Sequence, residues 1–194
     1  MASNWSAMTW FNPPARDETT ADGLIVTTGQ DTDFWQTTYY GFRHDNGHFL
    51  SRPRAGEFTM TTRFTGRYQT LYDQAGLMVR HDAENWLKCG IEFTDGLCHM
   101  STVATVDGRS DWSAFALGDL NGALDLRLTR LGDALFVQYR AAPEGSWRMA
   151  RLAYFPAGFT TLDVGIMACS PQRAGFEVMF HDFSVDDPVS RDIH

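Results

Sequence analysis

A face with mixed polar and aromatic side chains is predicted between residues 74 and 93. Trp86, Lys88 and Glu92 share one parity within a strand-like segment, and Leu, Cys and Ile stand at intervening positions. Side chains two residues apart project from the same face of a strand, so these three are expected to lie together. Gln74 has the matching parity in the preceding segment. Such a face can stack on a ligand ring while hydrogen-bonding its polar groups.

Two glycines, Gly76 and Gly90, share the parity of this face. Glycine inside a strand lowers stability and often marks a place where a ligand or another backbone approaches closely. The two residues therefore leave room either for a ligand or for a bulky neighbour such as Trp86. Both interpretations stay open at this stage.

Asp111 and Trp112 follow the turn residues Asp107 and Gly108, and they are predicted to lie in a loop. A tryptophan beside a carboxylate suits sugar recognition, because the indole can stack on a pyranose ring while the carboxylate accepts from hydroxyl groups. The alternative is structural. In that case Trp112 closes one end of the fold and Asp111 caps the loop backbone.

Catalysis of glycoside hydrolysis would require two carboxyl groups that flank the scissile bond. Glu92 is the best single candidate, with Asp73 or Asp111 as its partner, although Asp73 has the inward parity relative to Gln74. Lys88 is expected to keep Glu92 ionised, because a nearby opposite charge lowers the pKa of a carboxyl group. That expectation favours hydrogen bonding over general acid catalysis, so no catalytic residue is assigned.

The dipeptide Asn46-Gly47 predicts a hairpin with a two-residue turn, because a type I′ turn needs positive φ at both central residues. This turn would pair Asp45 with His48. His44 and His48 would then point to opposite faces, and no other histidine has ligand spacing. The sequence therefore predicts no metal site and no cofactor.

Period-two alternation recurs along the chain, and helical periodicity is nearly absent. Many short strands without intervening helices predict an all-β fold, either a sandwich or a barrel. A length of 194 residues fits one domain of this class, so residues 1–194 are expected to form a single two-sheet antiparallel sandwich.

Composition restricts the partners and the compartment. The formal net charge of −8, with scattered arginines, argues against nucleic acid and against an anionic membrane surface. No apolar run is long enough for a membrane helix. Three cysteines without metal-ligand spacing, and an N-terminus without signal-peptide character, predict a cytoplasmic protein with free thiols.

Four stretches carry a specific combination of motifs. They are DFWQTTYYGFRHDNGHFL (33–50), YDQAGLMVRHDAENWLKCGIEF (72–93), SDWS (110–113) and GIMACSPQRAGFEVMFHDF (165–183). Together they resemble the regulation-of-enolase protein family, within the concanavalin A-like lectin/glucanase superfamily. The resemblance implies a jelly-roll sandwich with a concave face. The motif positions are Trp35, Tyr40, His48, Asp73, Gln74, Trp86, Lys88, Glu92, Asp111 and Trp112. The glucanase motif E-x-D-x-x-E is absent.

Three functions remain open. The favoured one is carbohydrate binding without catalysis, for which the candidate ligand-binding residues are Gln74, Trp86, Lys88, Glu92, Asp111, Trp112 and His48. The second is a protein-interaction domain that regulates a metabolic enzyme. The third is a glycoside hydrolase with a non-standard carboxylate pair.

Overall fold

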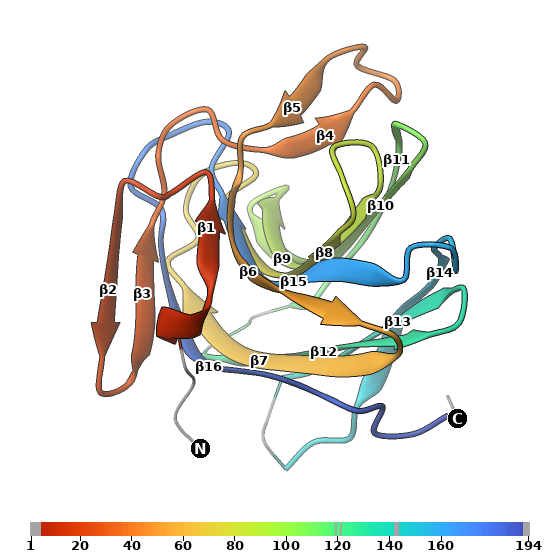
Figure 1. Ribbon diagram of the computed structural model, residues 1–194. Helices are drawn as coiled ribbons and strands as arrows, with labels where there is room; N and C mark the ends of the chain where they lie inside the picture. Colours follow the sequence, from red (N-terminus) through yellow and green to blue (C-terminus); the bar gives the residue numbers. More distant parts are fainter. Residues whose placement is uncertain (1–4, 119, 121, 142–143, 192–194) are drawn as a thin grey trace.

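The computed structural model describes residues 5–118, 120, 122–141 and 144–191 (Figure 1). Two seven-stranded antiparallel sheets form a jelly-roll sandwich, which confirms the predicted fold class. A short 3₁₀ turn, Trp5–Ala7, precedes the first strand. No helix among these residues is long and apolar enough to span a bilayer.

The first sheet carries the face predicted to bind a ligand. Its strands, in spatial order, are β1 (Thr9–Phe11), β6 (His48–Ala55), β15 (Thr161–Cys169), β8 (Gln74–Arg80), β9 (Trp86–Thr94), β10 (Leu97–Val106) and β11 (Arg109–Ala116). The second sheet packs against its other face. Its strands are β14 (Arg148–Tyr154), β13 (Ala134–Arg140), β12 (Leu124–Leu131), β7 (Phe58–Gly66), β16 (Glu177–Asp186), β3 (Gly23–Thr27) and β2 (Arg16–Thr20).

The register between β8 and β9 brings the side chains of the predicted face together. Gln74 lies opposite Glu92, and Met78 lies opposite Lys88. The residues between them point into the main core between the sheets, as Leu77 and Ile91 do. The even-numbered side chains therefore project together from the outer face of the first sheet, and that prediction is confirmed.

A small arm covers part of this outer face. It spans residues 33–45 and consists of β4 (Phe34–Gln36) paired with β5 (Arg43–Asp45). Figure 1 shows the arm above β8–β11. Beneath it lies a second apolar cluster, separate from the main core, whose members are Phe34, Trp35, Phe49, Met78, Trp86, Val103, Met167 and Cys169. Part of the face predicted to bind a ligand is therefore a core of its own.

The predicted hairpin at Asn46-Gly47 is wrong. The strand before it, β5, pairs with β4, whereas the strand after it, β6, pairs with β1 and β15. Neither residue has positive φ. A Cβ atom at Gly47 would lie 2.3 Å from the Phe34 ring, so glycine is needed there for packing under the arm.

The glycine pair on the outer face also has a packing role. Gly76 and Gly90 lie directly opposite each other on β8 and β9. A Cβ atom at Gly76 would lie 2.0 Å from the carbonyl oxygen of Cys89, and one at Gly90 would lie 2.1 Å from that of Ala75. Close approach of the two backbones accounts for both glycines, so no ligand is needed to explain them.

Candidate functional site

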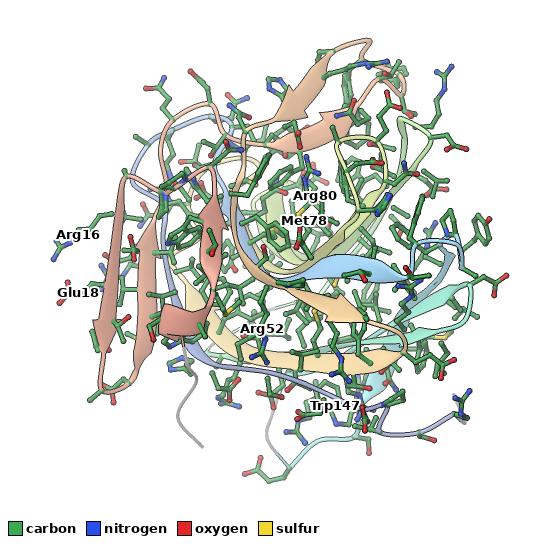
Figure 2. All side chains as sticks on the ribbon, viewed as in Figure 1. Arg16, Glu18, Arg52, Met78, Arg80 and Trp147 are labelled. Atoms are coloured by element: carbon green, nitrogen blue, oxygen red, sulfur yellow. The ribbon has the colours of Figure 1, made fainter. Side chains whose placement is uncertain are left out.

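The arm and the outer face of the first sheet enclose a cavity of about 410 Å³. That volume is within the range of small-ligand sites, about 300–1,000 Å³. Figure 2 shows Met78 and Arg80 on the sheet beneath the arm. The cavity is lined by Asp31, Asp33, Trp35, Tyr40, Phe42, His44, Tyr72, Gln74, Lys88, Glu92, Val103, Trp112, Pro171 and Gln172.

Aromatic rings form the wall of the cavity. Trp35, Tyr40 and Phe42 come from the arm, with ring centroids 5.6 Å apart for the first pair and 5.2 Å apart for the second. Trp112 comes from β11, an edge strand, so the prediction of a loop at this position is wrong. Its indole Nε1 donates to Ser101 Oγ at 3.0 Å, which fixes the orientation of the ring.

The floor of the cavity contains Lys88, the only lysine in the sequence. Lys88 is 4% exposed, and its Nζ donates to Asp33 Oδ1 at 2.7 Å. Gln74 Nε2 donates to the same carboxylate oxygen at 3.3 Å. Burial lowers the pKa of Lys88, but Asp33 and the other acidic groups nearby together outweigh that effect and leave the pKa raised. Lys88 therefore stays charged, and the ion pair ties the start of the arm to β9.

Glu92 lies beside this pair but does not share its hydrogen bond. It is 7% exposed, and its Oε2 accepts from Ser101 Oγ at 2.5 Å. Burial raises the pKa of Glu92, although Lys88 and Ser101 oppose the shift. Lys88 acts in the expected direction, but desolvation outweighs it, so the pKa of Glu92 is raised overall and not lowered as expected.

Glu92→Gln is expected to change how stability depends on pH. A carboxyl group whose pKa is raised by folding stabilises the native state below its unfolded pKa, about 4.3, and this contribution is lost as pH rises through the native pKa. As pH rises, the free energy of unfolding of wild type should therefore fall relative to that of Glu92→Gln. The fall should be about 1.4 kcal/mol for each unit by which the native pKa of Glu92 exceeds its unfolded pKa. Urea unfolding of both proteins between pH 4 and 9 measures the difference. Parallel pH profiles would contradict this assignment.

Strained backbone surrounds the cavity. Asp31, Thr37, Tyr39 and Tyr72 all have φ between 57° and 66°, in the left-handed region. Non-glycine residues held there cost about 1–3 kcal/mol each and cluster at functional sites. Tyr72 also has a raised pKa, first because it is partly buried and then because Tyr40 and Glu92 lie near its hydroxyl. The chain thus accepts local strain to shape this region.

Some predicted site residues line the cavity and others do not. Gln74, Lys88, Glu92 and Trp112 line it together. Trp86 is fully buried below, where its Nε1 donates to Ala83 O at 3.1 Å.

His48 is also buried, and its Nε2 accepts from the Gly29 backbone N–H at 2.9 Å. Burial lowers the pKa of His48, which matches a neutral ring with this acceptor role. This hydrogen bond, together with burial, gives His48 a structural role.

The two carboxylates considered as catalytic partners of Glu92 lie elsewhere. Asp73 is fully buried, and its carboxylate accepts from Arg173 at 2.6 Å and from Ser170 at 2.9 Å. Burial opposes ionisation, but these donors lower the pKa of Asp73. Asp111 alternates with Trp112 along β11 and accepts from Arg151 of β14 at 2.9 Å. Neither carboxylate lines the cavity with Glu92.

The cavity also contains residues that the sequence did not single out, namely Asp31, Asp33, His44, Tyr72 and Gln172. Asp33 is the most important of these because it neutralises Lys88. A buried lysine needs a carboxylate partner. That requirement is the signal that could have pointed to Asp33, which directly precedes Phe34 and Trp35 in the stretch 33–50. In the part of the chain that the structure describes, no group of three or more His, Cys, Asp or Glu side chains is arranged to hold a metal ion.

Comparison with known proteins identifies a family that this chain matches. Residues 10–188 match the family described as protein of unknown function (DUF1349). Regulation of enolase protein 1 from Saccharomyces cerevisiae is 41% identical over 186 residues, which cover 96% of this chain and 92% of that protein.

Two solved structures share the fold. A crystal structure of a functionally unknown protein from Saccharomyces cerevisiae superposes with a TM-score of 0.90 at 40% identity, covering 97% of this chain and all of that one. The carbohydrate-binding module CBM66 from Bacillus subtilis superposes with a TM-score of 0.60 at 16% identity, covering 95% and 98% of the two chains. On the family match and the 41% identical relative, the chain belongs to the DUF1349 family.

Proposed function

We propose that residues 1–194 act as one concanavalin A-like domain that binds a saccharide without catalysis. The observation that carries this proposal is the pairing of an aromatic wall with a polar floor inside one cavity. Sugars present both kinds of surface, because their C–H faces are apolar and their rims are hydroxyl groups. A single concavity that offers both kinds of partner therefore fits a sugar ring.

The wall supplies stacking surfaces. Trp112 is 38% exposed and Tyr40 is 49% exposed, although both rings are held in place by neighbouring groups. Trp and Tyr bury a large apolar area while keeping a polar group available for hydrogen bonding. Rings that are exposed and already oriented lose little conformational freedom on binding, which favours affinity.

The floor supplies directional hydrogen bonds. Lys88 has three N–H donors, of which one is directed at Asp33. Glu92 Oε2 accepts from Ser101, and the carboxyl group also faces the cavity. Bonds from hydroxyl groups to charged partners are stronger than bonds between neutral groups. The floor can therefore orient a sugar ring that stacks on the wall.

Further support comes from a structural relative. The structural neighbour from Bacillus subtilis is described as a carbohydrate-binding module. Cys89, Cys98 and Cys169 are all free thiols, as is typical of a reducing compartment, so we place the activity in the cytoplasm. Asp33, one of the two other carboxylates that line the cavity, is held by Lys88, and this engagement favours binding over hydrolysis.

Trp112→Ala is expected to weaken saccharide binding by about 1–3 kcal/mol, roughly 5- to 150-fold, because a central aromatic contact is lost. The saccharide is first chosen by screening wild type on a glycan array, and affinities are then measured by isothermal titration calorimetry. Phe115→Ala is the matched control, since Phe115 lies on the same strand, is 39% exposed and has the opposite parity. It should bind like wild type.

A wild-type protein that binds no glycan on the array would overturn this proposal. The second candidate function would then gain weight, namely interaction with a metabolic enzyme. It is favoured by the name of the 41% identical relative, Regulation of enolase protein 1. Co-sedimentation of this chain with purified enolase, in the absence of any glycan binding, would support it.

A further inference from the structure

Resting on the proposed function, we propose that the binding site has a second subsite beyond the cavity, and that its ligand is a neutral oligosaccharide. The second subsite is a separate hollow on the far side of Tyr40 and Trp112. Its lining residues are Trp35, Thr38, Tyr39, Tyr40, Ser110, Asp111 and Trp112.

The hollow and the cavity adjoin each other. Three aromatic residues, Trp35, Tyr40 and Trp112, line both. The hollow has a volume of about 420 Å³, similar to the cavity at about 410 Å³, but it is more open to solvent. A chain of sugars can therefore place one ring in the cavity and continue past these aromatic rings into the hollow.

Tyr39 lines this hollow from a loop whose backbone is held in place. Its side chain is 93% exposed, yet its backbone is held in the left-handed region with φ of 61°. The loop is held by bonds on both sides, since Trp35 Nε1 and the Tyr40 backbone N–H both donate to Thr38 O, at 3.1 Å and 2.7 Å. The Tyr39 ring meets the Tyr40 ring edge-on, with centroids 5.0 Å apart.

Such an exposed tyrosine contributes little to the stability of the fold, because its ring stays in water. A strained and hydrogen-bonded loop that nonetheless fixes it in place is expected where the ring has a binding role. Tyrosine is suited to this role, since it offers a large rigid surface with few rotatable bonds. The ring and the adjacent Tyr40 supply stacking faces for a second sugar.

Asp111 supplies a polar contact in the hollow. Its side chain is 68% exposed, and Arg151 fixes the carboxylate at 2.9 Å. An ionised carboxylate only accepts hydrogen bonds, so it recognises hydroxyl donors. The sequence suggests that Trp112 and Asp111 recognise a sugar together. Both residues line the hollow, whereas Asp111 does not line the cavity.

Charge defines the class of sugar. The described residues that line the two concavities include the carboxylates Asp31, Asp33, Glu92 and Asp111, whereas Lys88 is the only Lys or Arg among them. Lys88 is already matched by Asp33, and Asp111 is matched by Arg151 of β14, so Asp31 and Glu92 are the described lining carboxylates that lie outside these ion pairs. A uronate or a sugar phosphate would meet uncompensated negative charge, and like charges brought together oppose binding. The site therefore favours neutral chains.

The test is calorimetric titration of wild type with neutral mono-, di- and trisaccharides of xylose, glucose, mannose and fructose, beside galacturonic acid oligomers of the same lengths. For the series that binds, Kd should fall about tenfold or more from one sugar to three. Tyr39→Ala should remove that gain and weaken trisaccharide binding about tenfold. Tyr154→Ala is the matched control, because Tyr154 is 63% exposed on β14, away from both concavities, and it should bind like wild type.

The outcomes separate this inference from the proposed function. Equal Kd values for one and three sugars, or an unaffected Tyr39→Ala, would overturn the second subsite while leaving saccharide binding intact. Galacturonate chains that bind as tightly as neutral ones would overturn the assignment of a neutral ligand. If wild type binds none of these sugars, the proposed function and the inference fall together.

Discussion

Lys88→Ala should lower the free energy of unfolding by about 3–5 kcal/mol, because removal of one partner leaves the other charge buried and unpaired. The Asp33 side chain is only 18% exposed and would lose its ammonium partner at 2.7 Å. The position of Lys88 on the outer face suggests a mild effect, but the arm buries it. Urea unfolding monitored by tryptophan fluorescence measures the change.

Two comparisons isolate the cause. The double variant Lys88→Met with Asp33→Asn should recover much of the loss, since replacing both charges of a buried pair is often close to neutral. Arg16→Ala breaks an ion pair with Glu18 whose side chains are 73% and 51% exposed. It should cost less than about 1 kcal/mol. A loss below 1 kcal/mol for Lys88→Ala would show that the pair is not buried in solution.

Phe34→Ala should lower the free energy of unfolding by about 3–5 kcal/mol, the usual range for a buried phenylalanine. Phe34 is fully buried and anchors the arm over the sheet, with its ring centroid 6.0 Å from that of Trp86. Loss of this anchor should also displace the aromatic wall, so saccharide affinity should fall even at temperatures where the variant remains folded. Thermal unfolding and calorimetric titration test the two effects separately.

Phe42→Ala is the matched control on the same arm. Phe42 is 44% exposed, so its removal should change the free energy of unfolding by less than about 0.5 kcal/mol. Because Phe42 lines the cavity, its removal should still weaken saccharide binding. If Phe34→Ala and Phe42→Ala destabilised the protein equally, Phe34 would not be the anchor of the arm.

The strand pairs that form the sheet could be predicted from the sequence because local parity determines them. Gln74 and Glu92 share the outer face as predicted, and the hairpin between their strands, with its short polar turn, leaves little freedom of register. The arm could not be predicted in this way. Asn46 and Gly47 resemble a turn, but the Asn46 side chain instead donates to Asp31 O at 2.8 Å, and Gly47 makes room for Phe34. Those partners are set by tertiary packing.

The residues of the candidate site likewise fall into those that the sequence could predict and those that it could not. Lys88, Glu92 and Trp112 could be found because they lie on regular strands with defined faces. Asp33 and Tyr72 come from loops, and their positions depend on how the arm and the β7–β8 connection fold back over the sheet. Burial also sets the electrostatics, because desolvation raises the pKa of Glu92.

The lone lysine has a consequence for chemical modification. The only ε-amino group among the 194 residues lies at the bottom of the cavity with its charge neutralised. Acylation, methylation and ubiquitin attachment at lysine therefore require that the arm opens or the chain unfolds. In a protein labelled with ¹⁵N-lysine, a single side-chain ammonium resonance would report directly on whether the cavity is occupied.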